Sequence, residues 1–195
     1  MISPELTIVV PTYNERENVR PLVERLDRTL QAVPWEVIFV DDDSRDGTAA
    51  VVRQIGLKDP RVRCLQRIGR RGLSSACIEG MLTTPAPYLA VMDGDLQHDE
   101  ELLPKMLTVL QENDVDVVIG SRYMQGGRIG AWEQSRVRMS RIATFLGKVI
   151  LKAQLSDPMS GFFMLKRSFF EKTVHHMTGK GFKVLLDLFA SAPSK

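Results

Sequence analysis

Short apolar runs alternate with segments of helical periodicity along the first 120 residues. The runs are rich in β-branched residues and contain few polar positions, which is typical of parallel strands buried on both faces. They lie at 6–10, 36–40, 62–65, 88–92 and 115–119. The segments between them predict helices.

The helical segments show the spacing of one buried face. Apolar side chains recur at i, i+3 and i+4 over 19–30, and further helices are predicted to open at 46–48 and to cover 73–81 and 100–110. This alternation predicts an α/β protein with a mostly parallel sheet and helices on both faces. Right-handed crossovers then bring the C-terminal strand ends to one edge, where open α/β sheets bind ligands.

The pattern changes after Gly120. A glycine-rich loop precedes a long predicted helix over 132–153, which carries an apolar stripe and five Lys or Arg side chains. No repeat and no long linker interrupts the chain, so a single domain over 1–195 is predicted. Within it, residues 1–120 show the alternating strand and helix pattern, whereas residues 121–195 hold the glycine-rich loop and the long basic helix.

Charge divides the chain at the same point. The 195 residues are 44% hydrophobic, as in globular proteins, and carry a net charge of +2. Residues 1–120 hold 13 Lys and Arg against 20 Asp and Glu, a net −7, whereas 121–195 hold 13 against 4, a net +9. An acidic part favours a divalent cation, and a basic part favours phosphate groups or an anionic membrane. The alternative is two ordinary solvated surfaces.

Three further observations narrow the class of protein. No apolar run approaches the ~20 residues of a membrane-spanning helix, and residues 1–5 lack the basic start and apolar stretch of a signal peptide. Cys64 and Cys77 fit neither a zinc spacing nor a disulfide framework. We therefore expect a cytoplasmic protein with two buried, reduced thiols.

Polar clusters follow three of the predicted strands, at 11–15, 41–44 and 93–97. Because these strand ends share an edge, their carboxylates are expected to converge there. Close carboxylates repel one another unless a cation or a hydrogen-bonding ligand intervenes, so the clustering indicates a binding site. Five of these carboxylates belong to aspartates, Asp41, Asp42, Asp43, Asp93 and Asp95, and Glu15 adds another.

The sequence Asp93-Gly94-Asp95 predicts a divalent metal site. Two carboxylates directly after a buried strand suit Mg²⁺ or Mn²⁺, which complete their coordination with phosphate oxygens and water. Gly94 lets the backbone approach a ligand closely. The alternative is a turn in which an aspartate caps the next helix, a role that Asp99 suits better. The first turn is not Gly-x-Gly-x-x-Gly, which disfavours a dinucleotide-binding dehydrogenase.

Five motifs follow one another along nearly the whole chain. They are Pro11-Thr12-Tyr13-Asn14-Glu15, Val40-Asp41-Asp42-Asp43-Ser44-Arg45-Asp46-Gly47-Thr48, Met92-Asp93-Gly94-Asp95-Leu96-Gln97-His98, Gly120-Ser121-Arg122-Tyr123 and Asp157-Pro158-Met159-Ser160-Gly161-Phe162. Together they resemble the motifs of family-2 inverting glycosyltransferases and, more narrowly, of polyprenol- and dolichol-phosphate mannosyltransferases. The resemblance implies a GT-A-type fold. It also implies inverting transfer of a hexose, with mannose from GDP-mannose as first choice, to a polyprenyl or dolichyl phosphate.

The resemblance also implies roles for individual residues. The nucleotide-sugar donor is expected to contact Pro11, Tyr13, Glu15, Val40, Asp42, Asp93, Gly94 and Asp95. The metal, Mg²⁺ or Mn²⁺, is expected on Asp93, Asp95 and Gln97, and the acceptor phosphate on Arg122, Arg136 and Ser140. Guanidinium groups bind phosphate bidentately, and a serine four residues after an arginine shares its helical face. Catalysis is expected to depend on Asp95, Arg122 and Arg136.

The chain departs from the family pattern in two ways. Asp43 stands where the family has glycine, so a positive φ is less easily adopted there, although Asp tolerates it better than most residues. The family continues past this point with a strand and a basic motif that closes the donor site, so a C-terminally incomplete domain is expected. Lys180 and Lys183 lie where the family has a mobile acceptor-side loop, and a solvated lysine pair is the alternative.

The basic helix over 132–153 predicts a membrane-facing surface. A Trp132 start, an apolar stripe and cationic flanks suit a helix in the headgroup region, whereas a core helix with a solvated cationic face is the alternative. Together with a lipid acceptor, this predicts a peripheral position on the cytoplasmic face of a membrane.

Other functions compete with this one. UDP-glucose and other UDP-sugars serve close relatives with the same motifs, so a UDP-sugar polyprenyl-phosphate glycosyltransferase is one alternative. A nucleotide-sugar-binding or membrane-docking module without transfer activity is the non-enzyme alternative. A haloacid-dehalogenase-like phosphatase is disfavoured because its aspartate pair follows the first strand. No nucleic-acid partner is expected, since the basic part lacks a zinc finger or an RNA-binding signature. His98 is expected to pack at a helix start, and Phe162 and Phe163 to lie in the core.

Overall fold

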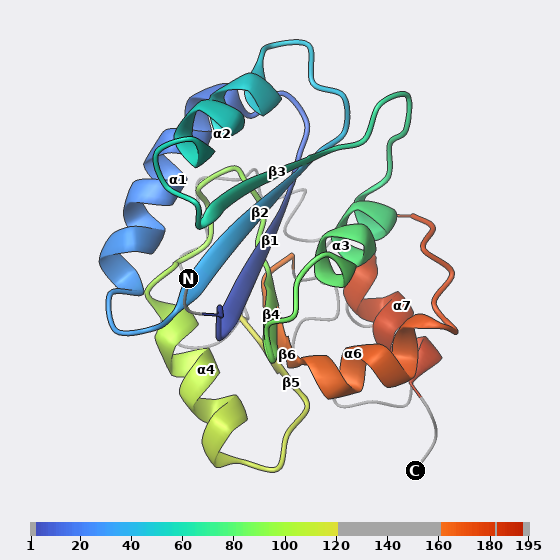
Figure 1. Cartoon of the computed structure of the whole chain (residues 1–195). Helices are drawn as coiled ribbons and strands as arrows, with labels where there is room; N and C mark the ends of the chain where they lie inside the picture. Colours follow the sequence, from blue (N-terminus) through green and yellow to red (C-terminus); the bar gives the residue numbers. More distant parts are fainter. Residues whose placement is uncertain (1–2, 121–160, 182, 193–195) are drawn as a thin grey trace, which may run out of the picture.

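The computed structural model describes residues 3–120, 161–181 and 183–192 and builds them around one six-stranded sheet (Figure 1). The strands are β1 (Leu6–Thr12), β2 (Trp35–Asp41), β3 (Val62–Gln66), β4 (Tyr88–Val91), β5 (Val117–Ile119) and β6 (Phe163–Lys166). Their order across the sheet is β3-β2-β1-β4-β6-β5. All five strands predicted from the apolar runs are confirmed.

The first four strands are parallel, as predicted. Strand β1 pairs with β2 and with β4, and β2 pairs with β3, each in parallel register. Strand β6 was not predicted, and it inserts antiparallel between β4 and β5. The bonds from Gly120 N–H to the Phe162 carbonyl (2.9 Å) and from Lys166 N–H to the Asp116 carbonyl (3.0 Å) continue its pairing with β5. The sheet is therefore mixed rather than wholly parallel.

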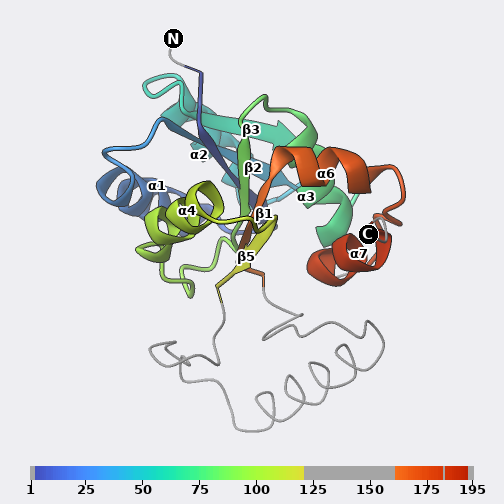
Figure 2. The same cartoon turned by 90° about the horizontal axis from the view of Figure 1, so that it is seen from below.

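Helices cover both faces of the sheet, which confirms the predicted α/β class. The helices are α1 (Arg16–Thr29), α2 (Thr48–Gly56), α3 (Leu73–Leu82), α4 (Leu102–Glu112), α6 (Arg167–Val174) and α7 (Val184–Ser191). Helices α1, α2 and α4 lie on one face, and α3, α6 and α7 on the other (Figures 1 and 2). No helix among the described residues is long and apolar enough to cross a membrane.

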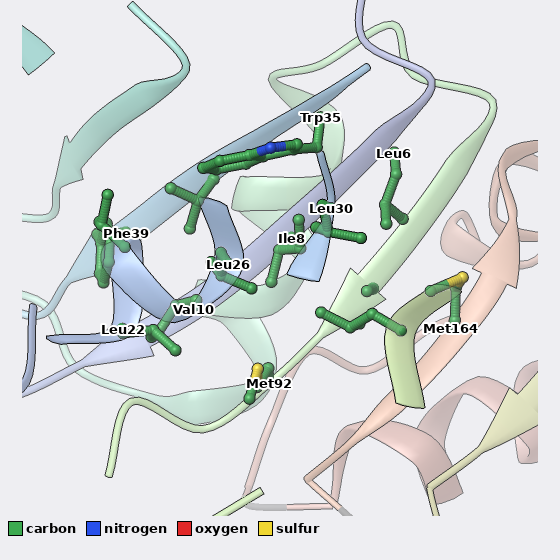
Figure 3. Packing of buried hydrophobic residues seen from close by; sticks show 14 of the residues in the cluster. Leu6, Ile8, Val10, Leu22, Leu26, Leu30, Trp35, Phe39, Met92 and Met164 are labelled. Carbon is green, nitrogen blue, oxygen red and sulfur yellow. The ribbon is translucent and has the colours of Figure 1, made fainter. Parts of the chain in front are cut away.

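Two apolar cores result from the alternation of side chains along the strands. Leu6, Ile8 and Val10 of β1 belong to the core under α1, while Val9 belongs to the core under α3. Figure 3 shows the first core, in which these β1 side chains lie among Leu22, Leu26, Leu30, Trp35 and Phe39. Phe162 and Phe163 are buried one in each core, as predicted for core residues.

The two cysteines are free thiols, as expected, but they differ in burial. Cys77 is fully buried in α3, and Cys64 is half-buried on β3. Burial raises the pKa of both thiols, because the thiolate loses its hydration in an apolar environment.

Candidate active site

The polar clusters after β1, β2 and β4 meet at the C-terminal edge of the sheet, as predicted. Strand β1 lies between β2 and β4, so the strand order reverses direction at β1. Ligands of open α/β sheets bind at such a switch point. The N–H of Asp42 donates to the Thr12 carbonyl (3.0 Å), and a Cβ on Gly94 would lie 3.3 Å from Thr12 Cγ2. The three loops are therefore in contact at the end of β1.

Hydrogen bonds join the turn after β1 to the turn after β2. The Asn14 N–H donates to Ser44 Oγ (2.8 Å), and the Arg45 N–H donates to Asn14 Oδ1 (3.2 Å). The Glu15 N–H donates to Thr48 Oγ1 (3.1 Å) at the start of α2. Asn14 itself has φ +58°, a conformation that asparagine tolerates better than most residues. These bonds hold Tyr13 and Glu15 beside the aspartates that follow β2.

Asp46 reinforces this connection as a partly exposed hydrogen-bond acceptor. Partial desolvation opposes its ionisation, but hydrogen bonds from the hydroxyl and N–H of Thr48 and from the Arg16 N–H outweigh it and hold the pKa of Asp46 below its usual value. The carboxylate thus ties the start of α1 to the start of α2.

The aspartates after β2 already have partners within the protein. Asp41 is buried and accepts hydrogen bonds from the Ser44 hydroxyl (2.6 Å) and N–H (3.0 Å). Asp43 has φ +59°, so the position where the family has glycine adopts the left-handed region, and its carboxylate faces the Gly69 N–H at 3.4 Å. The predicted repulsion among the carboxylates is relieved here by hydrogen-bond donors.

Asp42 pairs with a buried arginine that sequence reasoning missed. Arg67, on the loop after β3, is 2% exposed, and its Nε lies 3.3 Å from Asp42 Oδ1. The other Asp42 oxygen accepts the Gly72 N–H at 2.7 Å. The Arg67 guanidinium also donates to the Gly72 carbonyl (3.2 Å) and to Ser75 Oγ (2.8 Å). Arg67 therefore joins Asp42 to the loop before α3.

A second missed arginine lies on the same loop. The guanidinium carbon of Arg71 lies 4.0 Å from the centroid of the Tyr13 ring, and its Nη2 donates to Tyr13 Oη at 2.6 Å. Tyr13 is 41% exposed, so this pair stands at the surface of the site. The sequence signal for both arginines was a run of basic residues after β3. The sequence did not show how close this run lies to the aspartates after β2.

Asp93 is held by two neighbours on the other side of β1. The His98 ring lies 8% exposed, with Nε2 at 3.1 Å from Asp93 Oδ2, and it packs against Phe162 with ring centroids 5.2 Å apart. His98 thus packs before α4 as expected, and it also bonds to an aspartate of the predicted metal motif. A Cβ at Gly161 would also collide with Asp93 Oδ2. The position of the Asp93 carboxylate therefore depends on a glycine that is distant in sequence.

Asp95 and Gln97 complete the loop after β4. Asp95 Oδ1 accepts the Gln97 N–H (3.1 Å), and Leu96 between them has φ +62°. Within the described residues, no group of three His, Cys, Asp or Glu side chains is arranged to hold a metal ion. The set predicted from the sequence, Asp93, Asp95 and Gln97, consists of two carboxylates and one amide oxygen. These are hard oxygen ligands and fit an ion that takes its remaining ligands from a substrate and water.

The remaining predicted site residues divide between the described and undescribed parts of the chain. Pro11 and Val40 face each other in the β1–β2 register, and Val40 is buried. Arg122, Arg136, Ser140 and the predicted helix over 132–153 lie outside the described residues. Lys180 and Lys183 are exposed near the start of α7.

Comparison with known proteins places this architecture in a family. The family model described as "Glycosyl transferase family 2" matches residues 7–174. A dolichol-phosphate mannosyltransferase from Pyrococcus furiosus is 37% identical over 94% of this chain, and one from Saccharomyces cerevisiae is 36% identical over 98%. The chain spans 52% of the length of the first relative and 72% of the second.

Solved structures show the same fold at lower identity. Glucosyl-3-phosphoglycerate synthase from Mycobacterium tuberculosis, in complex with Mn²⁺, UDP and phosphoglyceric acid, superposes with a TM-score of 0.73 at 17% identity, over 95% of this chain and 62% of that one. A mannosyltransferase from Pyrobaculum calidifontis, in complex with GDP-mannose and Mn²⁺, superposes with a TM-score of 0.62 at 19% identity, over 95% of this chain and 51% of that one. These likenesses confirm the predicted GT-A-type fold. The motifs at the strand ends and the family match over most of the chain lead to one conclusion: this chain belongs to glycosyl transferase family 2.

Proposed function

We propose that this chain is the catalytic part of an enzyme that transfers mannose from GDP-mannose to a polyprenyl or dolichyl phosphate, with inversion at the sugar C1. The observation that carries the proposal is the grouping of Tyr13, Asp42 and the 93–95 loop at one switch point. The chain that carries this grouping is 36–37% identical to relatives named dolichol-phosphate mannosyltransferases.

The donor nucleotide is proposed to bind across the ends of β1 and β2. Tyr13 offers a partly exposed aromatic ring, one face of which carries the Arg71 guanidinium, and Asp42 offers carboxylate oxygens held by Arg67 and the Gly72 N–H. Aromatic faces stack on nucleobases, and a fixed carboxylate accepts hydrogen bonds from base or ribose donors. The base and ribose would therefore lie on the Asp42 side of β1, with the diphosphate toward Gly94.

A divalent metal fits the Asp93 side of β1. Asp93, Asp95 and Gln97 are the residues that would hold it, and two structural neighbours are complexes with Mn²⁺. When bound, Mg²⁺ or Mn²⁺ would neutralise negative charge on the departing nucleoside diphosphate. The protein's own contribution is to hold two carboxylates close to the diphosphate position, with His98 and Gly161 fixing Asp93.

The acceptor makes a catalytic base unnecessary. A phosphate monoester has a second pKa of about 6, so it is already mostly dianionic at neutral pH. One of its oxygens attacks the sugar C1, the new C1–O bond forms, and the bond from C1 to the diphosphate breaks with its electron pair. In this proposal Arg122, Arg136 and Ser140 orient the acceptor phosphate, a positioning role that suits bidentate guanidinium groups.

The lipid acceptor would place the enzyme at the cytoplasmic face of a membrane. The net charge of +9 over 121–195 favours contact with anionic headgroups. Co-sedimentation with anionic liposomes at low salt tests this part of the proposal, and protein that stays in the supernatant would contradict it.

Calorimetric titration tests the donor assignment. GDP, GDP-mannose, UDP and UDP-glucose are each titrated with Mn²⁺ and again with EDTA. We expect GDP and GDP-mannose to bind in the presence of Mn²⁺ and to bind much more weakly in EDTA. Preference for the uridine nucleotides would instead favour the UDP-sugar alternative. Binding without transfer of labelled mannose to dolichyl phosphate by the full-length protein would favour the non-enzyme alternative.

Gly161→Ala is expected to lower turnover about tenfold or more, because the added methyl group displaces the Asp93 carboxylate. Overpacking is also expected to reduce stability by about 1–3 kcal/mol. Mannosyl-transfer kinetics and urea unfolding measure the two effects separately.

Gly56→Ala is the matched control for this variant. A Cβ at Gly56 would lie 2.5 Å from the Val62 carbonyl oxygen, at the start of β3 and so at the opposite edge of the sheet. It is expected to lose stability but to keep its turnover per folded molecule. Equal losses of turnover in the two variants would contradict a specific effect of Gly161 on Asp93.

A further inference from the structure

The Arg71–Tyr13 pair spans the end of β2. Arg71 belongs to the loop after β3, while Tyr13 follows β1, and β2 lies between these two strands. The Gly72 N–H, next to Arg71, donates to Asp42 at the end of β2. The pair therefore lies beside Asp42, on the side of β1 where the base and ribose of the donor are proposed to bind.

Most of the hydrogen-bonding capacity of Arg71 is unused among the described residues. A guanidinium has five N–H donors, and in the part of the chain that the structure describes only the bond to Tyr13 Oη engages those of Arg71. The side chain is exposed, and the stacking contact at 4.0 Å holds the guanidinium in place. A guanidinium is planar and holds its N–H donors in a fixed geometry, so one that is restrained in this way suits a planar ligand with two adjacent acceptors.

The neighbouring arginine provides the contrast. Arg70 lies on the same loop and is also exposed, but its two terminal nitrogens donate to the two carboxylate oxygens of Glu79 at 3.0 and 3.1 Å. Its fork is therefore occupied within the protein. Of these two adjacent arginines, Arg71 is the one whose two terminal nitrogens are not both engaged by the described residues.

We propose that Arg71 determines base specificity by donating to the N7 and O6 acceptors of guanine while it remains against Tyr13. This inference rests on the proposed nucleotide-sugar function and adds a residue that selects the donor. Guanine presents two adjacent acceptors that match a guanidinium fork. Uracil has no such N7/O6 pair, so the same arginine gains less from it. The arginine would thus favour GDP over UDP through the base and not through the diphosphate, which the two nucleotides share.

The test compares Arg71→Gln with Arg70→Gln by calorimetric titration of GDP and of UDP in Mn²⁺. A bidentate arginine–guanine contact contributes about tenfold or more in discrimination. We expect the wild-type protein to prefer GDP, and Arg71→Gln to weaken GDP binding about tenfold while changing UDP binding by less than about twofold. The matched control Arg70→Gln removes the same charge from the same loop and is expected to keep the wild-type ratio of affinities.

The outcomes separate this inference from the function on which it rests. If Arg71→Gln weakens GDP and UDP by the same factor, the arginine acts on the diphosphate or on the general potential, and the inference is wrong while the donor site stands. If Arg71→Gln binds both nucleotides as tightly as the wild-type protein does, the inference is overturned in the same way. A wild-type preference for UDP overturns the inference together with the GDP-mannose assignment. A wild-type protein that binds neither nucleotide overturns the proposed function itself. Thermal unfolding of both variants verifies that each is folded.

Discussion

Asp95→Asn is expected to lower mannosyl transfer by about 10³-fold and to abolish the dependence of GDP binding on Mn²⁺. The substitution replaces one of two carboxylates proposed as metal ligands with a neutral amide of the same shape. Charge stabilisation by a bound metal contributes several kcal/mol, and each ~1.4 kcal/mol corresponds to a factor of ten in rate. Transfer kinetics at saturating metal and calorimetry with and without EDTA measure the two effects.

Asp99→Asn is the matched control, because its local geometry is the same. Asp95 Oδ1 accepts the N–H of Gln97 at 3.1 Å, and Asp99 Oδ1 accepts the N–H of Glu101 at 3.1 Å. Asparagine preserves this bond to the backbone at either position, so both variants keep the loop and lose one charge. Asp99→Asn is expected to retain transfer and metal-dependent binding. Near-normal turnover of Asp95→Asn would refute the metal assignment.

Arg67→Met is expected to lower the free energy of unfolding by about 3 kcal/mol, because it leaves the largely buried Asp42 carboxylate without its cation. The methionine fills a similar volume, so the loss reports the uncompensated charge more than a cavity. Urea unfolding measures it. GDP affinity of the folded variant is also expected to fall, since Asp42 is no longer held beside the Gly72 loop.

Two comparisons isolate this effect. Arg70→Met removes a neighbouring arginine whose partner Glu79 lies near the surface, and exposed ion pairs contribute only about 0–1 kcal/mol. Adding Asp42→Asn to Arg67→Met removes the unpaired charge, so the double variant is expected to be more stable than the sum of the two single losses predicts. Strictly additive losses would show that Arg67 stabilises the protein independently of the Asp42 charge, through packing and its bonds to Gly72 and Ser75.

The sheet was predictable where strands depend on local patterns. The runs at 6–10, 36–40, 62–65, 88–92 and 115–119 became β1 to β5, because a strand buried on both faces must be apolar at nearly every position. Strand β6 has only four residues, and the segment 121–160 separates it from β5. Its antiparallel place between β4 and β5 depends on long-range hydrogen bonds, which leave no periodic signal in the sequence.

The site was predictable in its residue types but not in its internal contacts. Parallel strands with right-handed connections must end at one edge, so the meeting of the 11–15, 41–44 and 93–97 clusters followed from topology alone. Asp43 adopts φ +59° although it stands where the family has glycine, so its replacement of that residue did not by itself reveal the left-handed conformation. The roles of Arg67, Arg71 and Gly161 did not follow, because each depends on which distant side chain it meets.

The sequence by itself determined the α/β class, the edge at which the chemistry gathers and the family to which the chain belongs. These properties arise from residue periodicity, from the handedness of crossovers and from motifs that are contiguous in the chain. Only the tertiary structure decided that Arg67 forms an ion pair with Asp42 and that Arg71 stacks on Tyr13. It also decided that Gly161 leaves room for the Asp93 carboxylate. The physical reason is that electrostatic and steric contacts fall off within a few ångströms, and those distances exist only once the strands have taken their order in the sheet.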